Sequence, residues 1–104
     1  MMERYIIQIT DEAQGDMEAI YLYIANKLQA PDTALKQYNR IADAIMELEY
    51  MPKRIKVMDS EPEHTRQIRR MNVNNYSVFF IVRDDRVIVT DVLYGSSDIS
   101  ARLR

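Results

Sequence analysis

The segment YSVFFIV, residues 76–82, constrains the fold more than any other part of this 104-residue chain. A strand that is apolar on both faces belongs in the middle of a sheet, where neighbouring strands and other elements cover it. On an extended backbone Tyr76, Val78, Phe80 and Val82 face one way, and Phe79 and Ile81 face the other. The chain must therefore supply a neighbouring strand on each side of this segment.

The flanking segments can supply both neighbours. Residues 66–73, RQIRRMNV, precede the central strand, and residues 86–94, RVIVTDVLY, follow it. Asp84 and Asp85 form a two-residue connection to the last segment, a hairpin signal related to Asp-Gly but weaker. The three segments predict an antiparallel meander, and residues 52–65, which lack periodicity and contain two prolines, predict a loop before it.

The first half of the chain predicts one strand and two helices. Residues 4–10 alternate as a short strand, and Thr10 can cap the helix that follows. Apolar residues then recur at spacings of three and four on both sides of Pro31, which suits the first position of a second helix. The first stripe is Ala13, Met17, Ile20, Ile24 and Leu28, and the second is Ala34, Tyr38, Ile41, Ile45 and Leu48. Two such helices should pack as an antiparallel hairpin.

The element order β-α-α-β-β-β predicts an α+β fold, with the helical hairpin over one face of a curved antiparallel sheet. We expect one domain over residues 1–104, with room for a short C-terminal helix after the last strand. No stretch approaches the roughly 20 apolar residues of a membrane span, and the amino end does not resemble a signal peptide. We therefore expect a cytoplasmic protein that does not engage a membrane.

Charge and residue usage narrow the function. The net charge is −2, but residues 1–51 hold four basic and nine acidic side chains, whereas residues 52–104 hold ten basic and seven acidic ones. Tight, sequence-independent binding of nucleic acid usually needs a more basic chain. Cysteine is absent, His64 is the sole histidine, and there are only two glycines, so we expect no metal site, no disulfide and no cofactor.

Three arginines gather at the start of the predicted meander: Arg66, Arg69 and Arg70. Adjacent residues of a strand point to opposite faces, so Arg69 and Arg70 cannot do the same job. Ile68 breaks the alternation, which indicates either a bulge or the start of the strand there. A half-buried arginine needs a counter-charge, and Asp91, which stands in an otherwise apolar strand, is the candidate partner of Arg69 or Arg70. A structural ion pair and a direct role in a site are both open.

The ordered motifs resemble the RelE/ParE superfamily of bacterial toxins. The similarity is carried by YLYIANKL, by RQIRRMNVNNYSVFFIV with its arginine (Arg69) and Asn75-Tyr76, and by VIVTDVLYGSSD, where Tyr94-Gly95 lead to Asp98. The resemblance covers nearly the whole chain and implies the fold described above. It also implies a small toxin that is encoded together with an antitoxin, which wraps it and neutralises it. The protein would then form either a homodimer or a hetero-oligomer with its antitoxin.

The chain departs from the ribosome-dependent ribonucleases of this superfamily, which resemble it in fold. They carry basic residues where this chain has Ser77, Ser96 and Ser97, and many relatives carry arginine where Asp91 stands. Stabilising charge on a phosphate suits arginine, lysine or histidine, and serine can do little of that work. The catalytic candidates that remain are His64, Arg69, Arg70 and Tyr94, and the candidates for binding a partner are Arg66, Arg69, Arg70 and Tyr94.

Three functions remain open at this stage. The first is a ParE-like toxin that binds and inhibits DNA gyrase without a catalytic site. The second is a ribosome-dependent mRNA endonuclease with an unusual site, and the third is a degenerate, non-toxic module that only pairs with its antitoxin. The serines and the acidic balance of the chain favour gyrase over the ribosome as the target.

Overall fold

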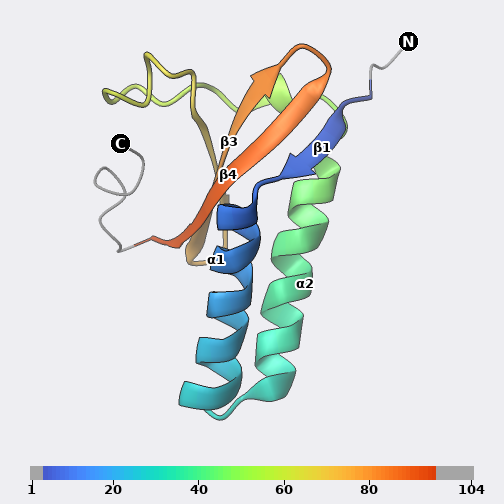
Figure 1. Cartoon of the computed structure of the whole chain (residues 1–104), viewed down its shortest axis with the longest axis vertical. Helices are drawn as coiled ribbons and strands as arrows, with labels where there is room; N and C mark the ends of the chain where they lie inside the picture. The colour runs from blue at the N-terminus through green and yellow to red at the C-terminus, as the bar shows by residue number, and fades with distance from the viewer. Residues whose placement is uncertain (1–3, 96–104) are drawn as a thin grey trace.

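The computed structural model describes residues 4–95, and its elements follow the predicted order. They are β1 (Ile6–Ile9), α1 (Asp11–Leu22), the π-helical turn η1 (Tyr23–Lys27), α2 (Pro31–Glu47), the 3₁₀ turn η2 (Pro52–Arg54), β2 (Arg69–Val73), β3 (Tyr76–Arg83) and β4 (Arg86–Tyr94). The arrangement is the expected α+β fold (Figure 1). The predicted short C-terminal helix, together with Ser96, Ser97 and Asp98, lies outside the described residues.

The four strands form one sheet in the order β1-β4-β3-β2. The antiparallel meander β2-β3-β4 is confirmed, with two-residue turns at Asn74-Asn75 and Asp84-Asp85. β1 lies parallel to β4, from Ile6 opposite Arg86 to Ile9 opposite Val89, so the prediction of a wholly antiparallel sheet is wrong at this edge. The helices, the loop and the other strands separate β1 from β4 in sequence, and a connection that long leaves either direction available.

The helical hairpin covers one face of the sheet, called here the inner face (Figure 1). Thr10 caps α1 as predicted, since its Oγ1 accepts a hydrogen bond from the amide of Ala13 at 3.1 Å. Pro31 occupies the first turn of α2. The core between the layers is made of Ala13, Met17, Ile41, Ile45 and Leu48 from the helical half and Val73, Val78, Phe80, Val87, Val89 and Val92 from the sheet. Both predicted helical stripes therefore form core, with one exception.

The exception is Leu28, which is 56% exposed although the spacing predicts it in the first stripe. The helix widens into a π-helical turn at η1, where the amide of Leu28 bonds to the carbonyl of Tyr23 five residues earlier at 3.2 Å. The wider turn changes the angular position of the residues that follow it. Ile24 stays buried, whereas Leu28 faces out.

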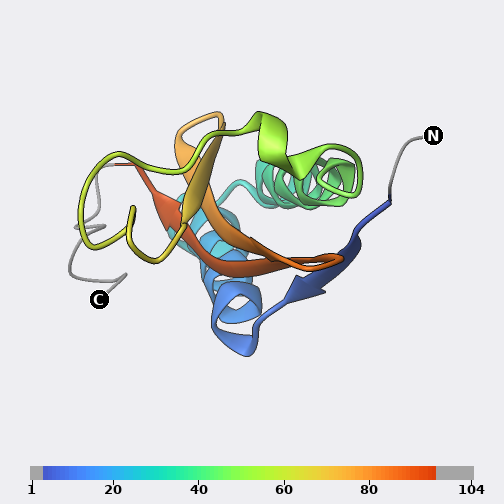
Figure 2. The same cartoon turned by 90° about the horizontal axis from the view of Figure 1, so that it is seen from above.

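The opposite face of the sheet, called here the outer face, carries a second and smaller cluster. It consists of Ile68, Phe79 and Leu93, with Met58 and Ile81 packed beside them. Ile68 lies just before β2, so the strand starts there rather than bulging. The irregularity falls instead between Phe79 and Phe80, where the register of β3 against β4 shifts by one residue. Figure 2 shows the strong curvature of the β3–β4 hairpin.

Candidate partner-binding site

The three arginines predicted to form a cluster point to three different places. Alternation holds, because Arg69 pairs with Phe80 on the inner face and Arg70 pairs with Phe79 on the outer face. Arg66 lies exposed in the loop before β2. The sequence therefore placed the arginines near one another along the chain, and the fold gives each a separate environment.

Arg69 serves the fold. Its Nη1 donates to the backbone carbonyls of Ile55 at 2.5 Å and Lys53 at 3.4 Å, which ties the chain after η2 to the edge strand β2. The half-buried guanidinium on the inner face is thus satisfied by carbonyl oxygens rather than by a carboxylate.

The predicted ion pair of Arg69 or Arg70 with Asp91 is wrong. Arg69 bonds to backbone carbonyls and Nε of Arg70 bonds to Ser77, and none of the ion pairs observed between residues 4 and 95 joins either arginine to Asp91. The register explains why: Arg70, Phe79 and Asp91 lie in one row across β2, β3 and β4, so a whole strand separates the two charges. The ring of Phe79 fills that row, with its centroid 5.8 Å from the guanidinium carbon of Arg70.

Arg70 is the cation of a polar hollow at the end of the sheet, which we call the arginine–tyrosine cleft. The cleft has a volume of about 400 Å³. It is lined by Arg70, Asn72, Asn74, Asn75, Tyr76, Ser77, Tyr94 and Gly95. Of the predicted site residues, the structure brings only Arg70 and Tyr94 together in it.

Ser77 holds Arg70 in place, a role that sequence reasoning missed. Its hydroxyl accepts a hydrogen bond from Nε of Arg70 at 2.9 Å and donates one to Oδ1 of Asn72 at 3.1 Å. Ser77 is 1% exposed, so these bonds form away from solvent. The signal was available: a two-residue turn at Asn74-Asn75 places Asn72 directly opposite Ser77.

Tyr76 and Tyr94 form the wall of the arginine–tyrosine cleft. They lie opposite each other where β3 begins and β4 ends, with ring centroids 5.6 Å apart and planes inclined at 65°. Tyr94 is 48% exposed. Burial raises the pKa of the Tyr76 phenol, and the neighbouring phenols of Tyr94 and Tyr23 raise it further.

The tyrosine pair also borders a second hollow, which we call the apolar groove. This groove has a volume of about 560 Å³. It is lined by Ala19, Ile20, Tyr23, Ile24, Leu28, Tyr76 and Tyr94, and so lies between the first helix and the end of the sheet. Leu28, turned out of the core by η1, contributes to it.

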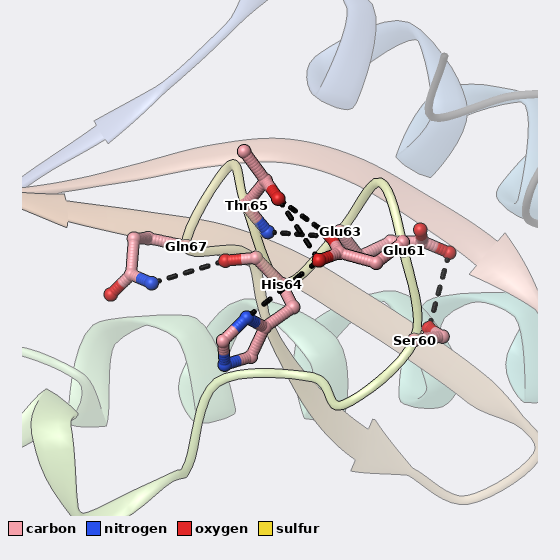
Figure 3. A network of polar contacts seen from close by, with 6 residues as sticks. All are labelled: Ser60, Glu61, Glu63, His64, Thr65 and Gln67. Atoms are coloured by element: carbon pink, nitrogen blue, oxygen red, sulfur yellow. Dashed lines mark hydrogen bonds and ion pairs between the residues drawn. The ribbon is translucent and has the colours of Figure 1, made fainter.

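His64 belongs to the framework of the loop before β2 (Figure 3). Its Nδ1 lies 4.0 Å from the Glu61 carboxylate, which also accepts hydrogen bonds from the amide and hydroxyl of Thr65 at 2.9 and 2.8 Å. The hydrogen bond from the backbone amide of Thr65, and after it the hydrogen bond from the Thr65 hydroxyl, lower the pKa of Glu61. Glu63 is buried and accepts a hydrogen bond from Ser60 at 3.3 Å. His64 is therefore exposed, as predicted, and is not one of the residues of the arginine–tyrosine cleft.

A third hollow opens on the outer face beneath that loop. Arg66, Ile68, Arg83 and Asp91 contribute to its lining, and its volume is about 570 Å³. Asp91 is 6% exposed, so it is buried as its apolar strand suggested. Within the described part of the chain, no group of three or more histidine, cysteine or acidic side chains is arranged to hold a metal ion.

The fold is a small α+β domain with two hollows that meet at a pair of tyrosines, one of which also contains an arginine. Residues 7–99 match the family described as the ParE toxin of the type II toxin–antitoxin system parDE. The chain therefore belongs to the ParE toxin family, and the resemblance to the RelE/ParE superfamily is confirmed.

A solved structure titled "Chromosomal ParDE TA system from P. aeruginosa" has a similar fold. The TM-score is 0.73, the identity is 21%, and the similarity covers 88% of this chain and 96% of that chain. At this identity the likeness supports the fold alone. No curated protein sequence matches the chain. Within residues 4–95, no helix has the length and apolar character needed to cross a membrane.

Proposed function

We propose that this chain is the toxin of a type II toxin–antitoxin module, that it arrests growth by binding DNA gyrase in the cytoplasm, and that a cognate antitoxin neutralises it. Membership of the ParE family supports both the role as a toxin and the existence of a cognate antitoxin. The observation that favours binding over RNA cleavage is the environment of Ser77. At this position the ribonucleases of the superfamily carry a basic residue, whereas here a buried hydroxyl bonds to Arg70 and Asn72.

The other candidates for catalysis support the same choice. Arg69 is bonded to backbone carbonyls, and His64 lies in the loop before β2. Among the described residues that line the arginine–tyrosine cleft there is no histidine, lysine or carboxylate. Proton transfer would have to come from Arg70, which does not lose its proton in proteins, or from a tyrosine. Such a cleft is better suited to contact a partner than to cut RNA.

Ribosome-dependent cleavage of mRNA is the second candidate, because Arg70 and Tyr94 do share one cleft. A non-toxic module that only binds its antitoxin is the third. Controlled induction in bacteria separates all three functions. We expect growth arrest with broken DNA and intact mRNA, together with inhibition of purified gyrase in a supercoiling assay. Codon-dependent cuts in translated mRNA would establish the second function, and unaffected growth in several hosts would leave the third.

A further inference from the structure

The sheet ends at β1 on one side and at β2 on the other, and the two edge strands differ in character. The loop before β2 covers the start of the β2 edge, where the amide of Met58 bonds to the carbonyl of Ile68 at 2.9 Å, and this edge continues through exposed Asn72. The other edge strand, β1, has the apolar sequence IIQI, and Figure 2 shows it at the margin of the sheet. An apolar edge strand is a template for pairing with a further strand.

The hydrogen bonds of β1 show which of its backbone groups point outward. The amide of Thr10 donates to the carbonyl of Val89 at 3.1 Å, and the amide of Ile6 bonds in the same way to the β3–β4 turn. The backbone groups of successive strand residues alternate between the two sides of the strand. The amides and carbonyls of Ile7 and Ile9 therefore point away from β4, along the margin of the sheet.

The chain after α2 closes the first part of this edge, because the amide of Tyr5 donates to the carbonyl of Glu49 at 2.8 Å. Within the described residues, the open part of the edge therefore runs from Ile7 to Ile9. Its side chains are apolar on both faces. Ile6 is 51% exposed on the outer face, and Ile7 and Ile9 are half-buried on the inner face, next to the core.

We propose that β1 pairs with β1 of a second copy of this chain, antiparallel and about a two-fold axis, so that the two four-stranded sheets join into one. Symmetric homo-oligomers most often have one two-fold axis, with the same patch on both subunits in contact. An edge strand meets this requirement with its own backbone groups. The inference goes beyond the proposed function and does not depend on the cellular target of the toxin.

One register uses the open backbone groups of β1 and none of those that are already bonded. In it, Ile7 of each copy pairs with Ile9 of the other, and the residues of each pair exchange both of their backbone hydrogen bonds. A register centred on Ile7 would need the amide of Tyr5, which is bonded to Glu49. A register centred on Ile9 would run the strand into the first turn of α1. The edge is thus complementary to itself, which favours a second copy over an unrelated strand.

The same register also matches the side chains. Gln8 lies on the two-fold axis, so the exposed amide groups of the two copies face each other on the outer face, where each can donate and accept. On the inner face, isoleucines of the two copies become neighbours and extend the core. Arg4 points along the strand toward the first turn of α1 in the second copy, which holds Asp11 and Glu12. Opposite charges across the interface favour this orientation.

Pairing at β1 leaves the arginine–tyrosine cleft open in both copies. β1 lies beside only the first half of β4, from Arg86 to Val89, whereas Tyr94 is at the other end of that strand. The dimer therefore carries two accessible clefts, one in each subunit.

Sedimentation velocity of the purified full chain tests the pairing. The wild-type chain should move from monomer to dimer as its concentration rises. Gln8→Lys places like charges on the axis and should raise the concentration at half-dimerisation by about fivefold or more. Gln8→Glu should do the same, and an equal mixture of the two variants should recover dimers, because opposite charges then meet. Thr33→Lys, the same kind of change at an exposed position of α2, is the matched control and should dimerise like the wild type.

Amide hydrogen exchange locates the interface in the wild-type chain and needs no variant. Protection of the Ile7 and Ile9 amides should increase with concentration, and protection of Asn72 on the β2 edge should not. A monomer at every concentration would overturn the pairing, and so would dimers that persist in both Gln8 variants or protection that rises at Asn72 instead. A mixture that recovers no dimers would overturn the register. These results leave the proposed function untouched, since growth arrest and gyrase inhibition test it separately.

Discussion

The two faces of the β2–β3–β4 meander differ in chemistry, although the same three strands form both. On the inner face, Val78, Phe80 and Val87 are fully buried beneath the helices. On the outer face, a smaller apolar cluster shares the surface with the polar side chains of Arg70 and Ser77. Because β3 is apolar on both sides only in its middle, one strand supports the core with one face and the candidate site with the other.

Because of this difference, neighbouring residues of one strand can serve either the stability of the fold or the binding of a partner. The adjacent arginines make it plain: Arg69 bonds to the backbone of the preceding loop, whereas Arg70 faces a cleft. Substitutions on the inner face should therefore act mainly on the free energy of unfolding. Substitutions around Arg70 should act mainly on binding.

The largest effect is expected from Phe80→Ala. Phe80 is 0% exposed in the inner core, so truncation removes buried apolar area and leaves a cavity. We expect the free energy of unfolding to fall by about 3–5 kcal/mol, measured by urea denaturation followed by circular dichroism. Tyr94→Ala, on the exposed wall of the cleft, serves as the control with a much smaller loss. Similar losses for the two variants would contradict the separation of the faces.

A smaller effect is expected where α1 is joined to the sheet. Oδ2 of Asp16 accepts a hydrogen bond from the backbone amide of Val92 at 3.0 Å. Removing the acceptor leaves a partly buried amide of β4 without this bond, so Asp16→Ala should lower the free energy of unfolding by about 1–3 kcal/mol. Glu18→Ala on the same helix is the matched control, because Glu18 is exposed and receives only a long contact from Gln14 at 3.5 Å. Equal stabilities for the two variants would show that the bond to Val92 is not formed in solution.

The inner face was predictable from the sequence because periodicity carries most of the information about a core. The spacing of Ala13 and Met17, and of Ile41 and Ile45, placed both stripes correctly. The prediction that Leu28 is buried was wrong, because a period of 3.6 residues per turn does not account for one π-helical turn. The direction of β1 failed for a related reason, since no local turn fixes its pairing with β4.

The candidate site was less predictable, because it depends on which side chains meet across strands. Alternation correctly separated Arg69 from Arg70, but the pairing with Asp91 required the strand order and the position of Phe79. From the sequence, Ser77 was interpreted only as a position without the positive charge that the ribonucleases carry. Its role as the acceptor for Arg70 follows from the register that the Asn74-Asn75 turn sets.

The third prediction concerns the outer face, where we expect a substitution to lower the free energy of unfolding by about 1 kcal/mol. Ser77→Ala removes the bonds to Arg70 and Asn72 without changing the backbone, and Arg70 is only half-buried, so water can replace part of what is lost. We expect a small loss in the free energy of unfolding and a larger loss in affinity for the antitoxin. Thr33→Ala, at an exposed position of α2, should change neither. Loss of stability without loss of affinity would place Ser77 in the fold alone.

The smallest effect concerns the tyrosine pair and pH. Burial, then the phenols of Tyr94 and Tyr23, raise the pKa of Tyr76 above its ordinary value of 10.0. The folded protein therefore keeps this phenolic proton to a higher pH than the unfolded chain does. The contribution to stability is complete below the unfolded pKa and is lost as the pH rises through the folded pKa, so the free energy of unfolding should decline across that alkaline window.

Ultraviolet titration of phenolate, with Tyr76→Phe subtracted to isolate this side chain, measures the shift. Tyr94→Phe keeps the ring contact but removes one phenolate, so the pKa of Tyr76 should move part of the way back toward its ordinary value. Because burial is the larger cause, a complete return in Tyr94→Phe would show that the wall of the cleft is open to solvent at Tyr76.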